Sequence, residues 1–256
     1  MSFPNMLFAP EGEQFNTYAA PTVAGQERTP LGTRLIMQDG REYRFYSVVT
    51  TVPVIGNMVQ RAAPVANDVN RAGIAANGAV GSRNPTLTTG GAVTANFYAE
   101  GYFNLSVANA AATAGSSGQV YVVDNHLAGT TATVYNLAAG HAIRSAAIDT
   151  TTRVDLIQNP YKNCIQSPIT TLTSHPIGAC VSTLATLQMG WIQTRGMASI
   201  LTSGTVVIGE QVIVPAGAAG AVGPNSAGGS ETESIVGYVA RVAATTAWSD
   251  IQLTLP

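Results

Sequence analysis

The sequence predicts an all-β fold, an antiparallel β-sandwich or barrel with an extended N-terminal arm and long Gly/Ala-rich loops. Runs of β-branched and aromatic residues recur along the chain, and turn signals separate them about every 8–12 residues, as in sandwiches and barrels. Amphipathic helices do not alternate with these runs, so βαβ units are not expected. The expected organisation is an arm at 1–32, a β-hairpin plus an irregular segment at 33–92, and a β-rich main domain at 93–256.

The first 32 residues are expected to be extended because they contain four prolines. Proline fixes φ and lacks a backbone donor, and the apolar residues between the prolines follow neither a helical nor a strand period. Dispersed apolar anchors suit the chain's own domain or a groove on a neighbouring subunit, and we expect the neighbour. The expected anchors are Phe3, Leu7, Phe8, Phe15 and Tyr18.

A hairpin is expected directly after the arm. Residues 33–38 and 41–48 are β-prone, and Asp39-Gly40 between them is a strong signal for a two-residue turn. A type I′ turn requires φ > 0 at both central residues, which Asp-Gly tolerates. Residues 33–48 therefore predict two short antiparallel strands joined by a type I′ turn.

The remaining segments are expected to alternate between strands and loops. Residues 54–76 predict either a short helix interrupted at Pro64 or a loosely wound loop, and 77–92 are loop by composition. Residues 216–230 are rich in Gly and Ala, lack a side chain suited to a core, and predict a long flexible loop. Strands are expected at 93–107, 119–125, 131–137, 141–148, 153–158, 163–166, 177–184, 189–195, 198–202, 206–214, 235–242 and 251–255.

The low charge content favours a subunit that packs against other subunits. Asp, Glu, Lys and Arg make up 10% of the residues, against about 25% in soluble globular proteins. Few charged groups then keep neighbouring molecules apart, although a monomer with a biased composition is the alternative. The formal net charge is −2 and the arginines are scattered, so direct nucleic-acid binding is not expected.

Neither a membrane partner nor a disulfide framework is expected. The sequence contains no apolar run long enough to span a bilayer, and its first residues lack the basic and apolar regions of a signal peptide. Cys164 and Cys180 are flanked by β-type residues. Two buried free thiols are expected, with a single bridge as the alternative.

The sequence contains no pattern typical of an active site, so we expect no enzyme activity, no metal and no cofactor. The Gly115-Ser-Ser-Gly118 segment lacks the spacing of a serine nucleophile elbow. His126, His141 and His175 do not have metal-ligand spacings. An enzyme would need a pocket that combines His126 or His141 with a carboxylate.

Four segments carry a resemblance to a known class of proteins. They are 98–103 (YAEGYF), 118–126 (GQVYVVDNH), 154–161 (VDLIQNPY) and 190–196 (GWIQTRG), and Gly209 and Val236-Gly-Tyr238 follow them. This arrangement resembles virion structural proteins of tailed bacteriophages, particularly those of marine and cyanobacterial hosts. The 190–196 segment and the closing strand are similar to capsid decoration, or cement, proteins.

The resemblance covers roughly residues 93–256 and implies a viral structural protein on the outer surface of the capsid. Such a protein binds the phage head, commonly as a homotrimer, and stabilises contacts between major capsid proteins. The implied partners are the major capsid protein and further copies of this chain, without direct contact to nucleic acid or membrane. Trp191 is a second candidate contact residue after the arm anchors, with a place in the core as the alternative.

Other structural roles stay open at this point. A receptor- or polysaccharide-binding knob or fiber protein would expose aromatic rings for stacking on sugars, and Tyr98, Tyr102, Phe103 and Tyr135 are the candidates. A tail or neck component would instead form rings around a charged lumen.

Overall fold

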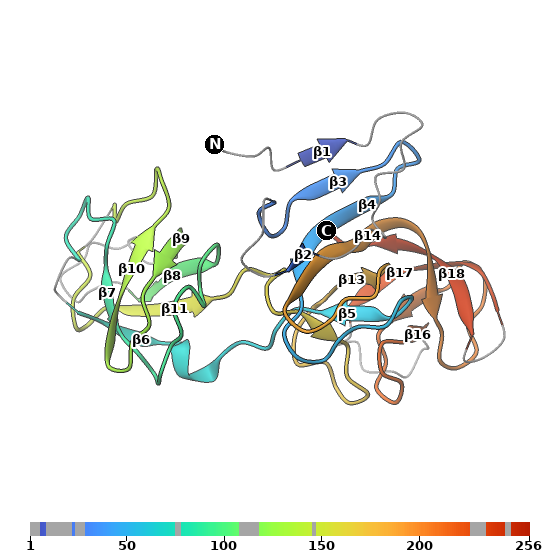
Figure 1. Cartoon of the computed structure of the whole chain (residues 1–256). Coiled ribbons are helices and arrows are strands. Elements are labelled where there is room, and N and C mark those ends of the chain that lie inside the picture. The colour runs from blue at the N-terminus through green and yellow to red at the C-terminus, as the bar shows by residue number, and fades with distance from the viewer. Residues whose placement is uncertain are drawn as a thin grey trace. The chain divides into compact units, whose positions relative to one another are not determined.

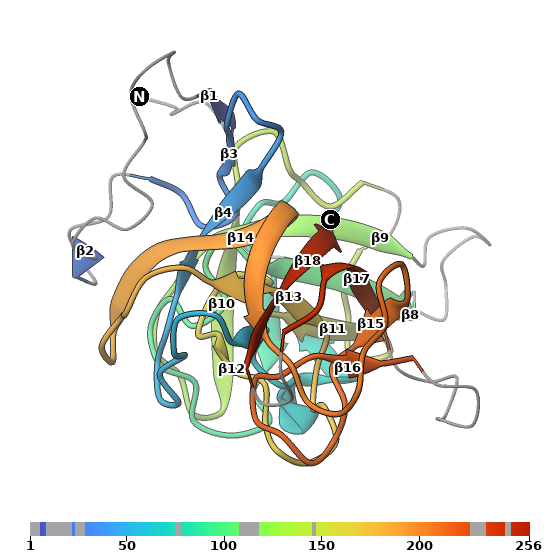
Figure 2. The same ribbon diagram turned by 90° about the vertical axis from the view of Figure 1, so that its right-hand side faces the viewer.

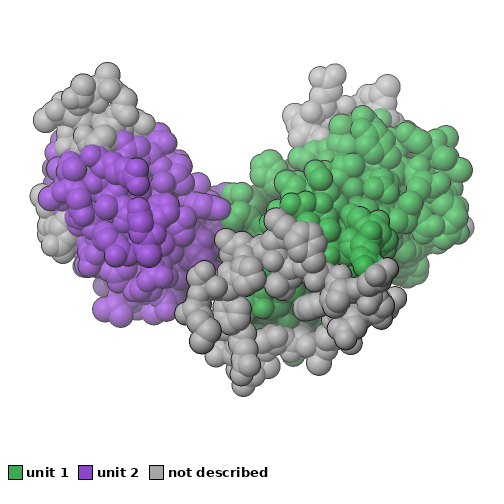
Figure 3. Space-filling model, turned by 90° about the horizontal axis from the view of Figure 1, so that it is seen from above, with its two compact units in different colours: residues 1–63, 160–256 green, residues 64–159 purple. Residues whose placement is uncertain are grey.

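The chain forms two compact units. Unit 1 comprises Met1–Ala63 and Pro160–Pro256, and unit 2 comprises Pro64–Asn159 (Figure 3). The boundary expected between residues 92 and 93 falls inside unit 2, because strands before and after it belong to one barrel. The computed structural model describes residues 6–8 and 22–23 by their backbone, together with 29–74, 78–107, 118–144, 147–225, 234–243 and 247–256.

Unit 1 is a 12-stranded sheet (Figure 1). Its strands are β1 (Met6–Phe8), β2 (Thr22–Val23), β3 (Arg34–Ile36), β4 (Glu42–Ser47), β5 (Met58–Gln60), β12 (Ile165–Gln166), β13 (Pro176–Cys180), β14 (Gln188–Leu201), β15 (Gln211–Ile213), β16 (Gly223–Pro224), β17 (Ile235–Arg241) and β18 (Trp248–Thr254). The main path runs β1-β3-β4-β14-β18-β17-β15-β16, while β2 and β13 also pair with β14, and β5 links β13 to β12. The pairing of β1 with β3 is parallel, and the other strand pairs of unit 1 are antiparallel.

The long strand β14 joins the two parts of this sheet. Its first half pairs with β4 and its second half with β18, with Arg195 in both ladders (Figure 2). The change of partner occurs beside Gly196, which has a φ of 83°. The Gln193 side chain spans this bend, because its Nε2 donates to the carbonyl oxygens of Arg195 at 3.1 Å and Met197 at 2.8 Å. A glycine with positive φ therefore lets one strand serve both ladders.

The two halves of β14 are buried differently. The first half is buried on both faces, with Trp191 in a cluster that includes Leu35 and Tyr43, and Ile192 in a cluster that includes Tyr46. The second half alternates between buried and exposed residues and adds its inward side chains to a third cluster of β17 and β18 residues. Unit 1 thus has apolar side chains packed on both faces of β14 near Trp191 and on one face farther along.

Unit 2 is a closed barrel (Figure 1). Its strands are β6 (Arg71–Ile74), β7 (Thr86–Thr88), β8 (Tyr102–Val107), β9 (Gln119–His126), β10 (Ala132–Leu137) and β11 (Arg153–Ile157). The order is β10-β7-β6-β11-β8-β9, and β9 pairs with β10 to close it. Inward side chains of alternating strand positions fill the barrel, and Phe103 contacts Tyr121 and Tyr135 at centroid distances of 6.3 Å and 6.4 Å.

The antiparallel sheets confirm the predicted all-β class. A single 3₁₀ turn, η1 (Ala66–Asp68), is the helical element among the residues that the structure describes. Segment 54–76, expected as helix or loop, instead contains β5, η1 and β6, and β7 lies within the expected loop 77–92. Described residues of 141–148 form no strand, because this segment bonds β9 only through side chains and meets residues 78–82 through single backbone hydrogen bonds.

The hairpin at 33–48 is confirmed, but its predicted type I′ turn is wrong. Gly40 has a φ of 84°, whereas Asp39 is not among the residues with positive φ. Met37 N–H donates to the Arg41 carbonyl at 2.9 Å, and Gly40 N–H donates to the Met37 carbonyl at 3.1 Å. The loop therefore has three residues and places glycine in the left-handed conformation at its end.

The Gly/Ala-rich segment 216–230 also differs from the prediction of a plain loop. Ala221 and Val222 are fully buried, and Val222 belongs to the cluster that β17 and β18 form. A parallel bridge joins Val222 to Thr202. Small side chains are therefore sufficient to fill the narrow space at this end of the sheet, while residues 226–233 lie outside the described part of the chain.

Substitution at Gly196 should separate backbone strain from steric overlap. Gly196→Ala places a β-carbon at positive φ and 3.0 Å from the Arg41 Cα, whereas Gly40→Ala has positive φ and nothing within 4 Å. We expect Gly40→Ala to lower the free energy of unfolding by about 1 kcal/mol and Gly196→Ala by about 2 kcal/mol or more. Urea unfolding measures both. Equal losses of stability in the two variants would show that steric overlap with Arg41 adds nothing to the strain of positive φ at Gly196.

Candidate functional site

The structure describes only part of the expected arm. Leu7 and Phe8 lie in β1, whose backbone pairs with β3 of the same chain. Phe3, Phe15 and Tyr18 lie outside the described residues. The docking of these five side chains in a neighbouring subunit stays a prediction.

Trp191 lies in the core of unit 1. Its side chain is 8% exposed and meets the Phe45 ring edge to face, with ring centroids 5.3 Å apart. The first half of β14 is covered on both faces, so no alternate position along it points to solvent. Of the two roles expected for Trp191, the structure supports the core role and not a surface contact.

A different part of unit 1 exposes apolar side chains. Val54, Ile55 and Trp248 are 57%, 47% and 49% exposed, and we call them the Trp248 patch. The Trp248 indole lies against Gly56 of the turn that contains Val54 and Ile55: a β-carbon on Gly56 would lie 2.2 Å from Trp248 Nε1. The patch thus combines a half-exposed tryptophan at the start of β18 with two aliphatic side chains of one turn.

Backbone hydrogen bonds hold this turn in place. Asn57 N–H closes the turn on the Val54 carbonyl at 3.0 Å, and Gly56 has a φ of 79°. Gly56 also donates to the Cys180 carbonyl at 2.9 Å and accepts from Leu201 N–H at 2.8 Å. The turn is therefore fixed to β13 and to the end of β14, and the Trp248 patch is a preformed surface.

The aromatic residues expected to stack on sugars are mostly inside the barrel. Tyr98, Phe103 and Tyr135 are buried, and Tyr102 is partly buried. Phe103 and Tyr135 occupy inward positions of their strands, while Tyr98 enters the barrel interior from the turn before β8. The prediction of an exposed stacking surface is wrong for Tyr98, Phe103 and Tyr135, whose rings fill the core, whereas Tyr102 is partly exposed.

The buried carboxylate of Asp68 lies beside Tyr98 in unit 2. The Tyr98 hydroxyl donates to Asp68 Oδ2, whereas Asp68 Oδ1 and the Tyr135 hydroxyl have no hydrogen-bond partner. Burial, which disfavours a charged phenolate, and the nearby Asp68 raise the pKa of both tyrosines above the usual value of 10. Both phenols therefore stay protonated in the folded protein well above neutral pH.

His126 is a structural histidine of the same region. Its side chain is buried, its Nε2 accepts from Tyr98 N–H at 3.0 Å, and its Nδ1 lies 2.9 Å from the Leu127 carbonyl. This pattern assigns the neutral tautomer with the proton on Nδ1. Both ring nitrogens are thus engaged by the backbone.

The two cysteines are free and buried, which confirms the expected thiols. Burial raises the pKa of Cys164 and of Cys180, because a thiolate is poorly solvated in the core. The Tyr46 hydroxyl lies 3.8 Å from Cys180 Sγ. Both thiols are therefore packing residues and are not poised as nucleophiles.

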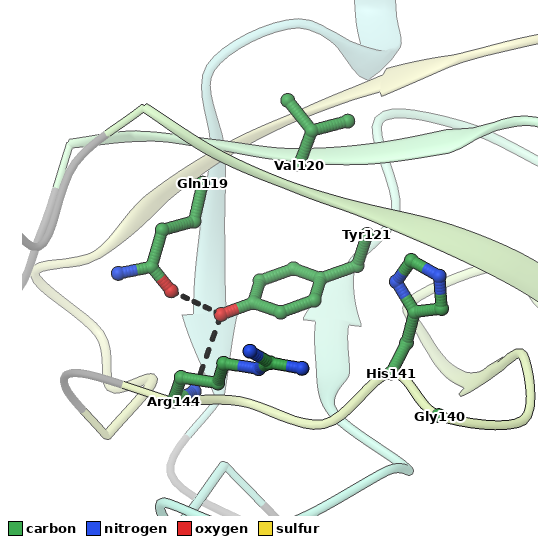
Figure 4. A pocket seen from close by; sticks show the side chains of 6 residues that line it. All are labelled: Gln119, Val120, Tyr121, Gly140, His141 and Arg144. Atoms are coloured by element: carbon green, nitrogen blue, oxygen red, sulfur yellow. Dashed lines mark hydrogen bonds between the residues drawn. The ribbon is translucent and has the colours of Figure 1, made fainter.

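A pocket with polar and apolar lining residues opens on the barrel of unit 2 (Figure 4). Its volume is about 350 Å³, and its lining residues come from the start of β9 and from the segment after β10. No sequence pattern predicts this pocket, because its two sides are separated along the chain and one side has no regular structure. The residues that line it are Gln119, Val120, Tyr121, Gly140, His141 and Arg144.

Within the described ranges, no three His, Cys, Asp or Glu side chains come close enough to hold a metal ion. The part of the chain that the structure describes contains no helix long and apolar enough to cross a membrane. Comparison of the chain with protein families, curated proteins and solved structures yields no match.

Two tyrosine substitutions should differ in their effect on stability. Tyr98→Phe removes the hydroxyl that donates to the buried Asp68, so the free energy of unfolding should fall by about 1–3 kcal/mol. Tyr135→Phe removes a buried hydroxyl without a partner and should change it by less than about 0.5 kcal/mol. Urea unfolding at pH 7 compares them. A loss for Tyr135→Phe as large as that for Tyr98→Phe would show that the hydrogen bond is not the cause.

Alkaline pH should destabilise the protein through the same tyrosines. Their pKa is raised in the folded state, so the unfolded chain loses these protons first, near the usual pKa of 10. Stability is therefore fully present below pH 10 and falls as the pH rises above it, by up to about 1.4 kcal/mol per pH unit for each tyrosine. Urea midpoints between pH 8 and about 11 measure this slope. Tyr135→Phe should make it shallower, and an unchanged slope would contradict the assignment.

Proposed function

We propose that this protein is a viral structural protein, a capsid decoration or cement protein of a tailed bacteriophage. In this role it binds the outer surface of the head as a homotrimer and stabilises contacts between major capsid proteins. The assignment to a virion rests on the resemblance within residues 93–256. The observation that carries a role in assembly is the Trp248 patch on unit 1.

The Trp248 patch has the properties of an interface centre. A half-exposed tryptophan beside two exposed aliphatic side chains gains free energy when a partner removes it from water, at about 25 cal/mol per Å² of apolar area. Tryptophan is also among the residues that most often dominate binding energy. Because hydrogen bonds already fix the turn of Val54 and Ile55, its ordering costs little on binding.

The low charge content supports the same role. With 10% charged residues, contact with a neighbouring subunit removes few ionic groups from water. An interface of this kind depends on apolar contact and neutral hydrogen bonds and is weakly sensitive to salt. These properties suit a protein that remains bound to a particle under varied ionic conditions.

Stabilisation of the head would follow from mass action. A ligand that binds an assembled shell better than a broken or immature one shifts the equilibrium toward the assembled shell. No chemical step is needed, and the protein acts through the number and strength of its contacts. The proposed contribution of each copy is the burial of the Trp248 patch against the shell or against another copy at the head surface.

Binding to isolated phage heads that lack the protein tests this proposal. Ile55→Ser and Trp248→Ala should weaken cosedimentation with the heads, by about thirtyfold or more for Trp248→Ala, because a hot-spot tryptophan contributes about 2 kcal/mol or more. The matched control is Leu127→Ser, at a residue that is 81% exposed in unit 2. Circular dichroism should show unchanged folding for the three variants.

If Ile55→Ser and Trp248→Ala bind heads as strongly as the wild-type protein does, the Trp248 patch is not part of the interface. Failure of the wild-type protein to bind any head would count against the decoration role itself. Strong inhibition of binding by moderate salt would contradict the apolar character of the contact.

A further inference from the structure

The pocket of unit 2 lies where β10 separates from β9. The two strands pair from His126 to Val123, and the register shifts at the end of β10. Beyond this point the backbone of β9 is met by the segment that follows β10: Ala138 N–H donates to the Val122 carbonyl at 2.9 Å, and Val122 N–H donates to His141 Nδ1 at 3.4 Å. The start of β9 therefore has an edge that β10 does not cover.

Strand geometry places further backbone groups at this edge. Val123 N–H donates to the Gly101 carbonyl beside β8, so odd positions of β9 bond toward β8 and even positions point the other way. The N–H and carbonyl of Val120 consequently point to the same side as those of Val122, and Val120 lines the pocket. At Val120 this edge of β9 thus offers one N–H donor and one carbonyl acceptor to a ligand.

The other wall of the pocket is the segment after β10, and the Tyr121 side chain of β9 holds it in place. Its hydroxyl donates to Gln119 Oε1 and accepts from the backbone N–H of Arg144 at 3.2 Å. Figure 4 shows the Arg144 side chain extending beside the Tyr121 ring toward His141. The His141 and Tyr121 rings meet edge to face, with centroids 6.4 Å apart. The wall is therefore held by contacts that do not use the Arg144 guanidinium.

The side chains that line the pocket favour an anionic ligand. Arg144 is exposed, and the ion pairs in the described part of the chain are made by other arginines. His141 accepts at Nδ1, so its neutral ring carries the proton on Nε2 and can donate there. No carboxylate is among the described residues that line the pocket. A guanidinium in such a place binds an oxyanion through two parallel hydrogen bonds.

We propose that this pocket binds an acidic saccharide, whose carboxylate or sulfate group pairs with Arg144 while its hydroxyl groups bond to the β9 edge at Val120. A sugar hydroxyl is both donor and acceptor, which matches the N–H and carbonyl of Val120, whereas a simple inorganic anion would leave the carbonyl unused. The volume of about 350 Å³ lies within the usual range for small-ligand pockets. This inference does not depend on head binding, because the Trp248 patch belongs to unit 1.

Isothermal titration calorimetry of the full chain at low salt tests the proposal with three probes. Tetragalacturonate carries carboxylates, sulfated maltotetraose carries sulfates without carboxylates, and maltotetraose is neutral. We expect at least one acidic probe to bind and maltotetraose to bind at least tenfold more weakly. Inorganic sulfate is included as a further competitor and should displace the saccharide only at much higher concentration.

Matched variants locate the site. Arg144→Gln should weaken binding of the acidic probe by about tenfold or more. Arg153→Gln removes the same charge elsewhere in unit 2, where the guanidinium donates to the Thr150 and Thr152 carbonyls, and should leave binding unchanged. His141→Asn keeps an acceptor for Val122 N–H but lacks the Nε2 donor, and should weaken binding by a smaller factor. Thermal unfolding verifies that each variant is folded.

The possible outcomes are distinct. Preference for the galacturonate or for the sulfated probe identifies which oxyanion the pocket takes. Equal binding of maltotetraose, equal weakening by Arg144→Gln and Arg153→Gln, or no binding of any probe at millimolar concentration would overturn the proposal. None of these results bears on cosedimentation with heads, so the two proposals can fail separately.

Discussion

The bend of β14 at Gly196 is the constraint on which unit 1 depends. One strand supplies the ladder partners of both β4 and β18, and it can do so only because a glycine at positive φ turns its hydrogen-bonding edge between the two. The first half of the strand is consequently enclosed and holds Trp191 in the core. Its far end, at Leu201, bonds the turn that presents Val54 and Ile55, so the exposed patch also depends on the path of β14.

Period-2 patterns predicted the β class and many of the strands, since alternation along a strand reflects local geometry that the sequence carries directly. Pairing between distant segments is not local. No local pattern in the sequence of residues 64–159 predicts a separate barrel. Closure of the barrel depends on the register between β9 and β10 and between β6 and β7. Likewise the Asp39-Gly40 dipeptide predicted a hairpin correctly, but the turn type followed from the pairing of Met37 with Arg41.

The candidate surfaces were harder to predict than the fold for the same reason. In β18 the alternation of Trp248, Asp250 and Gln252 was a signal that the tryptophan faces outward with polar neighbours, but its contact with Gly56 required the folded chain. Trp191 lacked such a signal, because both faces of its strand are covered. The pocket of unit 2 had no such signal, since one of its walls is an irregular segment held by the Tyr121 hydroxyl.

We propose that this chain is a component of the head surface, held there by apolar contact. The most direct test of this proposal is the location of the protein in a phage particle, by electron microscopy of virions labelled with an antibody against this chain, together with the mass of the purified protein in solution. We expect label in many copies over the outer surface of the head and a trimer in solution. Label confined to the tail tip or neck, or a virion without label, would contradict it.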